Sequence, residues 1–342
     1  MSNIFVYLFQ ILIFYFYLPI VLLAFILKFT KNQKTLPKPL LVFTSFGIGP
    51  GIISIIVYYL LFFLPKYSSC FYVIILLIII FIITIITNSY IKESVYLIIG
   101  LVKNTNKIIL ILLFIILSFW QIIVFTIPIL GHDTYEYANQ GKIFFNNKQI
   151  TYSKHQFDQN TNFYYVGRHG FAYPLVATTE KFFNDIFNIN KDLLFKSISG
   201  YYWILIILLQ YYILSKKNKT LAIISTITLV SSFGFTIMFA FFHLDTFRIF
   251  LLLLSIICCL FSLKNNNTIN LILFGITSGI SGNIHSIGVI LSMILFLTYF
   301  LFSKEKINHK FKNLFIVFIT FLIFGGIHYL FDIIWGTGWL LF

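Results

Sequence analysis

The segment from Gly131 to Phe145, "GHDTYEYANQGKIFF", places ionisable side chains directly after a long apolar run. Asp133, Glu136 and Tyr137 stand at i, i+3 and i+4, so one face of a helix would carry two carboxylates and a phenol. A carboxylate at this position could take the proton of an attacking hydroxyl group, which is general-base chemistry. In the structural alternative, Asp133 caps the start of a helix and Glu136 supports its first turn.

A second polar cluster lies in "YYVGRHGFAYPL", where Arg168 and His169 follow a glycine and precede an aromatic run. The planar fork of an arginine suits phosphate oxygens, and a histidine exchanges protons near neutral pH. In the structural alternative, Arg168 pairs with Glu180 or anchors at lipid headgroups.

Further clusters occur where later apolar runs begin or end. "FFHLDTFRIF" contains His243, Asp245 and Arg248, and ionisable groups this close to a membrane are functional candidates. The alternative is an ion pair between Asp245 and Arg248 at a helix end. "SGNIHSIG" contains His285, which is either a ligand-binding group or a polar turn residue. Near the C-terminus, an acidic residue and two tryptophans indicate either a site or an aromatic belt (Asp332, Trp335, Trp339).

The elements that must position these residues are membrane helices. The chain is 59% hydrophobic and only 10% charged, with a mean hydropathy of +0.95. Soluble domains carry about 25% charged residues, so this composition predicts an integral membrane protein. The net charge of +14 does not indicate nucleic acid, because the lysines cluster in short loops between apolar runs. The three cysteines have no metal or disulfide spacing and indicate apolar packing (Cys70, Cys258, Cys259).

A membrane-spanning helix needs about 20 apolar residues. This rule predicts an all-α, multi-pass protein of about ten transmembrane helices. The N-terminal run lacks a basic n-region and a small-residue cleavage site, so it is expected to be retained as the first helix. The eighth and ninth helices are short and close together. The predicted spans are 5–27, 40–64, 71–90, 108–130, 198–215, 220–238, 247–263, 269–283, 286–302 and 313–331.

The lysines predict the orientation of these helices. With the N-terminus outside, fifteen of the 24 basic residues fall in loops on the inner side, as the positive-inside rule requires. The long loop 131–197 then lies on the outer face. Its stretches "YEYANQGKIFF", "FYYVGRHGFAYPL" and "TTEKFFNDIF" predict amphipathic helices lying along the interface. All the polar clusters share this outer face, so they predict an outward-facing polar cavity covered by the loop.

This arrangement resembles the GT-C superfamily of polyprenyl-phosphate-sugar-dependent glycosyltransferases, which includes protein mannosyltransferases and lipid A aminoarabinose transferases. In that family a spanning helix leads into a long outer loop that opens with a catalytic acidic residue, as in "GHDTYEYANQGKIFF". "GRHGFAYPLVATTEKFF", "FFHLDTFRIFLLLL" and "FGITSGISGNIHSIGVILSMILFL" follow in the family's order. The resemblance covers 108–342 as a seven-helix core, with three helices in 1–107 before it. The chain stops after "WGTGWLLF", as expected of a truncated or minimal member.

The resemblance implies sugar transfer from a polyprenyl-phosphate-linked donor to a glycan, lipid or protein acceptor, with the prenyl chain in a groove among apolar helices. Asp133 would be the general base, and Glu136 would assist it. Arg168 would bind the donor phosphate with His169. Many members carry two adjacent acidic residues where this chain has His132–Asp133–Thr134, so a metal-independent mechanism without a cofactor is favoured. The substrate-binding residues implied are His132, Tyr137, Lys142, Arg168, His169, Tyr173, His243, Asp245, Arg248 and His285.

Two other classes of function are compatible with the sequence. A transporter or flippase of lipid-linked glycans would explain the many helices, but it predicts inverted repeats and polar residues at the bilayer midplane. Neither is visible, because the polar groups lie at one boundary. A non-catalytic assembly subunit would use the long loop to bind a partner. Haem or metal redox chemistry is disfavoured, since the seven histidines do not pair across helices at recognisable spacing.

Overall fold

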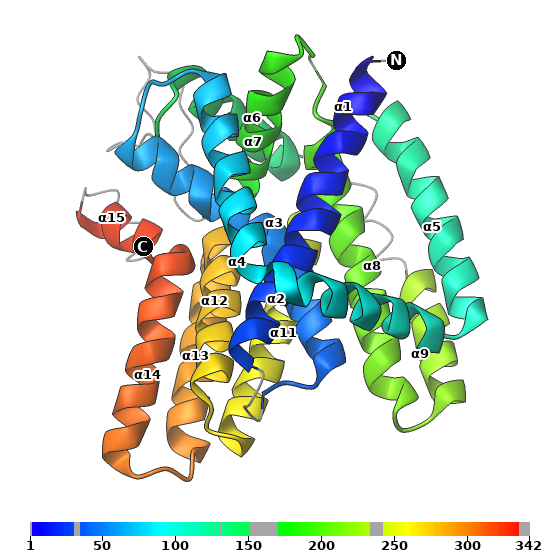
Figure 1. Cartoon of the computed structure of the whole chain (residues 1–342), viewed down its shortest axis with the longest axis vertical. Coiled ribbons are helices and arrows are strands. Elements are labelled where there is room, and N and C mark those ends of the chain that lie inside the picture. Colours follow the sequence, from blue (N-terminus) through cyan, green and yellow to red (C-terminus); the bar gives the residue numbers. More distant parts are fainter. Residues whose placement is uncertain are drawn as a thin grey trace.

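A computed structural model describes residues 2–30, 35–129, 132–150, 170–189, 191–232 and 242–334, and every regular element within them is a helix (Figure 1). The helices are α1 Ser2–Ile11, η1 Leu12–Tyr17, α2 Leu18–Thr30, α3 Lys38–Phe63, α4 Ser69–Asn104, α5 Lys107–Thr126, α6 His132–Asn147, α7 Ala172–Ile186, α8 Leu193–Ser215, α9 Lys219–Ser231, α11 Asp245–Lys264, α12 Thr268–Ile284, α13 Ser286–Phe302, α14 Ile307–Phe321, η2 Leu322–Gly326 and α15 Ile327–Ile334.

Seven of the described helices are long and apolar enough to cross a membrane, which supports the predicted all-α multi-pass class. Three shorter apolar helices, α9, α12 and α13, occupy the other predicted positions, and the count of ten spans stays a prediction. The seven candidate spans are Asn3–Thr30, Lys38–Phe63, Ser69–Asn104, Lys107–Thr126, Leu193–Ser215, Asp245–Lys264 and Ile307–Leu330.

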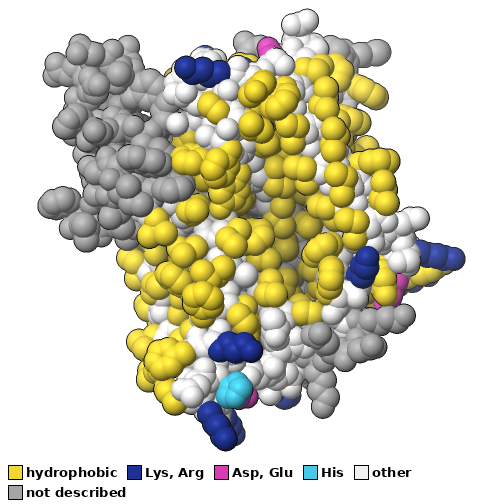
Figure 2. Space-filling model, turned by 60° about the vertical axis from the view of Figure 1, so that its left-hand side comes forward, with side chains coloured by type: hydrophobic (Ala, Val, Ile, Leu, Met, Phe, Trp, Pro, Cys, Tyr) yellow, Lys and Arg dark blue, Asp and Glu magenta, His cyan; other side chains and the backbone are white. Residues whose placement is uncertain are grey.

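The sides of these helices that face outward are apolar. Phe81, Phe114 and Phe302 have at least 64% of their surface exposed. Figure 2 shows one face of the molecule that is hydrophobic over most of its described area, with charged side chains toward its top, bottom and right-hand side. So much exposed hydrocarbon is stable only against lipid, since soluble monomers rarely expose large apolar patches.

The two ends of the bundle differ in what they carry. Figure 1 places the N-terminus, α6 and α7 at the upper end, and the α8–α9, α11–α12 and α13–α14 connections at the lower end. The connections at the lower end contain lysines, among them Lys216, Lys217 and Lys304. Of the polar clusters, the described residues His243, Asp245 and His285 stand at the ends of α11 and α12 opposite the α11–α12 connection, and therefore away from the lysine-rich turns. Which end faces the cell exterior stays a prediction.

Helix α4 corrects one predicted boundary. The sequence predicts a span over 71–90 followed by a loop, but α4 continues to Asn104. No proline interrupts 91–104, and the charged side chains of Lys92 and Glu93 find partners in Tyr96 and Lys38 without breaking the helix. A straight helix of 36 residues would measure roughly 54 Å, more than the roughly 30 Å hydrocarbon core. Figure 1 shows α4 descending beside α2 and then turning to cross the bundle toward α5.

The loop predicted over 131–197 contains two described helices, as the sequence expects, but α7 does not lie on the surface. Twelve of its fifteen residues are buried, because α7 packs against α3, α4, α6 and α8. A glycine on α6 allows the close approach of α7: an added Cβ on Gly141 would lie 2.5 Å from the carbonyl oxygen of Pro174. The predicted interfacial position is therefore wrong for α7, which is part of the core.

Helices α12 and α13 are separate, as predicted. The chain is extended at His285, with φ −159° and ψ 144°, and this single residue ends α12 and precedes α13. The His285 ring caps α13, because Nδ1 accepts the backbone N–H of Ile287 at 3.1 Å. The break holds an imidazole at the upper end of both helices.

Candidate functional site

The first turn of α11 gathers three of the predicted residues. Nη2 of Arg248 lies 2.5 Å from Oδ1 of Asp245, and Nδ1 of His243 lies 3.1 Å from its Oδ2. The backbone N–H of Asp245 also points to His243 Nδ1, at 3.3 Å. The ion pair at i and i+3 is the structural alternative considered from the sequence, and it forms. All three side chains stay partly exposed, between 16% and 30%, so a ligand can reach them.

A fourth predicted residue lies near this cluster. His285, at the α12–α13 break, contributes to the electrostatic environment of Asp245. Helices α11 and α12 make the most extensive helix–helix contact in the described fold, which fixes their upper ends relative to each other. Arg248 and His243 thus contact the Asp245 carboxylate, and the His285 imidazole acts on it electrostatically. Such a set offers several N–H donors to an anionic oxygen, which suits a phosphate or a sugar hydroxyl.

Two predicted tyrosines connect the long loop to the same cluster. The Tyr173 hydroxyl donates a hydrogen bond to the carbonyl oxygen of Phe242, the residue before His243. The rings of Tyr137 and Tyr173 meet edge to face with their centroids 5.6 Å apart. Burial raises the pKa of the Tyr173 phenol well above its usual value, so the hydroxyl stays protonated and acts as a donor. Tyr137, Tyr173 and His243 therefore belong to one contiguous region.

Phe242 has an unusual backbone conformation in this region. Its φ of 55° is in the left-handed region, which side chains other than glycine rarely adopt. The Tyr173 hydrogen bond and the packing of the Phe242 ring on Trp120, 5.3 Å away, hold it there. The turn aims the chain into α11, and strained residues of this kind concentrate at functional sites.

The start of the long loop is only partly described. His132 and Asp133 form the first residues of α6, and the positions of their side chains lie outside the described structure. The two roles predicted for Asp133, general base and helix cap, therefore both stay predictions. Glu136 is half-buried on the same helix, whereas Lys142 is exposed.

Arg168 and His169 lie outside the described residues, but Gly170, which follows them, is described. It is so close to α12 that an added Cβ would lie 1.8 Å from the carbonyl oxygen of Asn283. The Asn283 side chain accepts the backbone N–H of Phe171 at 2.8 Å. Because Asn283 precedes His285 by two residues, the start of α7 is attached beside the His285 end of α12.

Glu180 is a buried carboxyl group that the sequence assigned no role beyond possible pairing with Arg168. Its two oxygens accept the backbone N–H groups of Leu194 and Phe195 at 2.7 and 2.8 Å, so it caps the start of α8. Burial raises its pKa to about 8, although the two amides oppose this. An acidic residue on the apolar face of "TTEKFF" was the available signal.

A second polar group, formed by Ser69, Lys148 and Asp185, was not predicted from the sequence. Lys148 donates to the Ser69 hydroxyl at 2.8 Å, and that hydroxyl donates to Asp185 at 2.6 Å. Burial lowers the pKa of Lys148. The three residues come from three distant parts of the chain, so no local spacing predicts the group. It joins the ends of α4, α6 and α7 at the upper end of the bundle.

Within the described parts of the chain, no group of three or more His, Cys, Asp or Glu side chains is arranged to hold a metal ion. Comparison of the chain with protein-family models, with curated proteins and with solved structures returned no match. The resemblance to the GT-C superfamily therefore stays a prediction that depends on the residues and their arrangement.

Proposed function

We propose that the protein is a membrane glycosyltransferase that uses a polyprenyl-phosphate-linked sugar and acts at the outer face of the membrane. The observation that carries this proposal is the cluster of His243, Asp245, Arg248 and His285 at one end of an apolar bundle. A donor of this class has a charged phosphate at the membrane boundary and a hydrocarbon tail within the bilayer. The protein offers N–H donors at the boundary and apolar helices below it.

The predicted residues have different roles in the proposed reaction. The acceptor hydroxyl loses its proton to the Asp133 carboxylate while its oxygen bonds to the anomeric carbon of the sugar. The bond from that carbon to the phosphate oxygen breaks, and the electron pair leaves with the polyprenyl phosphate. Arg248 and Arg168, with His169, stabilise the departing phosphate. Glu136, Tyr137, Lys142, Tyr173 and the remaining histidines orient the sugar and the acceptor.

A transporter of lipid-linked glycans is the second candidate, and the distribution of charge disfavours it. Apart from Lys92 and Glu93 of the overlong α4, the charged residues of the seven candidate spans lie close to a helix end. Transporters of this kind bind substrate near the bilayer midplane, using interrupted helices. A non-catalytic assembly subunit is the third candidate, and it differs from an enzyme in tolerating the loss of Asp133.

The test compares a deletion strain complemented with wild type, Asp133→Asn or Glu93→Gln, with equal membrane amounts of each. Glu93→Gln is the matched control. It removes an exposed carboxylate of α4, which pairs with Lys38 and is not among the predicted site residues. Glycans and glycolipids are profiled by mass spectrometry. We expect wild type and Glu93→Gln to restore one defined sugar mass, and Asp133→Asn to lower its formation roughly 10²-fold or more. Full restoration by Asp133→Asn would show that Asp133 is structural.

A further inference from the structure

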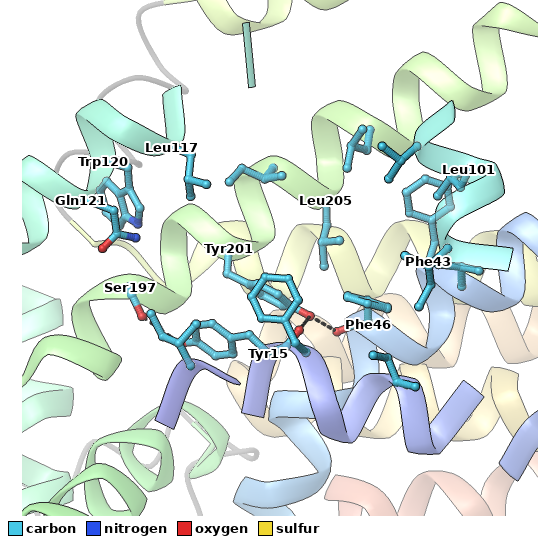
Figure 3. Close-up of a pocket in the computed structure, with 18 residues that line it drawn as sticks. Tyr15, Phe43, Phe46, Leu101, Leu117, Trp120, Gln121, Ser197, Tyr201 and Leu205 are labelled. Carbon is cyan, nitrogen blue, oxygen red and sulfur yellow. Dashed lines mark hydrogen bonds between the residues drawn. The ribbon is translucent and has the colours of Figure 1, made fainter. Parts of the chain in front are cut away.

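An apolar cavity of about 320 Å³ lies away from the candidate site, within the helical bundle. Five parts of the fold enclose it: the α1–η1–α2 helix, α3, α4, α5 and α8 (Figure 3). The lining side chains are almost all hydrocarbon, among them Ile20, Val42, Phe46, Leu117, Ile204 and Leu205. A cavity with such walls binds an alkyl chain rather than a polar molecule.

The tyrosine hydroxyl groups along this cavity form hydrogen bonds with backbone carbonyl oxygens. Tyr15 and Tyr201 stack with their centroids 4.4 Å apart, and Figure 3 shows both beside the cavity. Their hydroxyls donate to the carbonyl oxygens of Leu194 and Phe46, at 3.0 and 2.8 Å. The rings therefore present only their faces and edges to the cavity. Tyr15 belongs to the π-helical turn η1, a distortion that often accompanies a binding site.

The cavity follows α8 from Ser197 down to Leu208, roughly 16 Å along the helix axis. At the upper end stands Trp120, which is 1% exposed. Gln121, beside it, accepts a hydrogen bond from Tyr7 at 2.9 Å. A bulky headgroup does not fit among these packed side chains, so the upper end suits the terminal part of a chain.

A second cavity of about 290 Å³ adjoins the lower end. Phe43, Leu101 and Leu208 line both cavities, so these three side chains stand at the boundary between them. Together they follow α8 for roughly 27 Å, close to the hydrocarbon thickness of a bilayer. The second cavity is more polar, because its lining includes Asn104, Thr105, Tyr211, Tyr212 and Ser215.

Two lysines stand beside tyrosines that line the polar cavity. The ammonium groups of Lys92 and Lys216 stand over the rings of Tyr96 and Tyr212, at 5.9 and 4.4 Å from the ring centroids. Both tyrosines line the cavity. Glu93, the acidic residue next to Lys92, is paired with Lys38 at 2.9 Å. The opening is therefore positively charged.

We propose that these two cavities form a binding site for an anionic glycerophospholipid. One acyl chain occupies the apolar cavity along α8, and the phosphate lies in the polar cavity near Lys92 and Lys216. The charge of the opening selects an anionic headgroup, and the polarity gradient sets the chain's direction. None of the described residues assigned to the proposed glycosyl transfer lines this site, although Trp120 in its wall packs on Phe242, the residue before His243.

The test uses the fluorescence of Trp120, which lines the apolar cavity. The full chain carries Trp203→Phe, Trp335→Phe and Trp339→Phe and is reconstituted into phosphatidylcholine vesicles. Phosphatidylglycerol or phosphatidylcholine with brominated chains is added at equal mole fraction, since bromine quenches a tryptophan that it contacts. We expect brominated phosphatidylglycerol to occupy the site with roughly thirtyfold preference, the size expected from two lysines near a membrane surface.

Two test variants, each with a matched control, locate the effect. Lys92→Gln with Lys216→Gln should remove the preference, whereas Lys304→Gln with Lys312→Gln, the matched control in exposed lysines away from the cavities, should keep it. Leu208→Phe, which narrows the junction, should lower quenching by both lipids, unlike Ile213→Phe on the exposed side of α8. Equal quenching by both lipids in the starting chain would overturn the proposal. So would native mass spectrometry of the wild-type chain that finds no retained anionic phospholipid.

Discussion

Glu180 is a carboxylic acid with 1% of its surface exposed, and it connects a helix of the long loop to a membrane-spanning helix. It belongs to α7, yet both its oxygens accept backbone N–H groups at the start of the spanning helix α8. Buried backbone N–H groups without partners each cost about 1–3 kcal/mol, so this side chain stabilises the attachment of the loop to the bundle. Its protonation state then affects the stability of the whole upper end.

The raised pKa of Glu180 predicts a pH dependence of stability. The folded chain keeps this proton up to about pH 8, whereas the unfolded chain loses it above the ordinary value of 4.5. The stabilisation is complete below pH 4.5 and is lost as the pH rises toward 8. The Tm of the detergent-solubilised protein should therefore fall between pH 5.5 and pH 8.5.

Glu180→Gln should flatten this dependence, because an amide does not ionise, and should cost about 1–3 kcal/mol at pH 5.5 through one lost acceptor. Glu93→Gln, which changes an exposed carboxylate, should keep the wild-type slope. If Glu180→Gln shows the same slope as wild type, another group is responsible.

At the scale of elements, the contact between α5 and α8 depends on one small residue. An added Cβ on Gly200 of α8 would lie 2.1 Å from Nε1 of Trp120 on α5. The indole ring also packs on Phe242, so it links α5 and α8 to the turn that precedes the His243 cluster. Spacing between these helices is therefore coupled to the position of the candidate site.

Gly200→Ala should destabilise the protein by about 1–3 kcal/mol, because the methyl group must displace a packed indole. The matched control is Gly100→Ala on α4, where an added Cβ meets nothing within 4 Å. That change should stabilise by up to about 1 kcal/mol through helix propensity alone. The measurement is the Tm of both variants and wild type in one detergent. Equal shifts in Tm for the two variants would contradict the contact between Gly200 and Trp120.

At the scale of the whole molecule, the two ends of the bundle carry different chemistry. The chain places His243, Asp245 and His285 at the ends of α11 and α12 that lie opposite the α11–α12 connection, and the lysine-rich connections lie at the lower end (Figure 1). The positive-inside rule assigns the lysine-rich end to the cytoplasm. A donor presented outside the cell would then meet the His243 cluster directly.

Single cysteines test this orientation. Asn146→Cys at the end of α6 and Asn218→Cys between α8 and α9 are both exposed positions, at opposite ends. They are placed in a Cys70→Ser background, because Cys70 is exposed while Cys258 and Cys259 are buried. A membrane-impermeant maleimide should label only Asn146→Cys in intact cells and both variants after permeabilisation. Labelling of Asn218→Cys alone in intact cells would reverse the orientation.

Much of the candidate site is local and so was predictable. His243, Asp245 and Arg248 are neighbours within one helical turn, and their ion pair follows from spacing. His285 was recognised as a residue at a turn, because the glycines and polar residues around it interrupt two apolar runs. Its approach to Asp245 required the packing of α12 on α11, which no spacing specifies.

The sequence by itself determined the membrane class and the approximate positions of the helices, because hydrophobic runs of sufficient length need nothing beyond their own composition to prefer lipid. Only the tertiary structure decided which helices touch. It placed α7 in the core, extended α4 to Asn104, and joined Ser69 to Lys148 and Tyr173 to Phe242. Apolar surfaces attract one another without direction, so the pairing of distant residues depends on how the side chains interlock in the complete bundle.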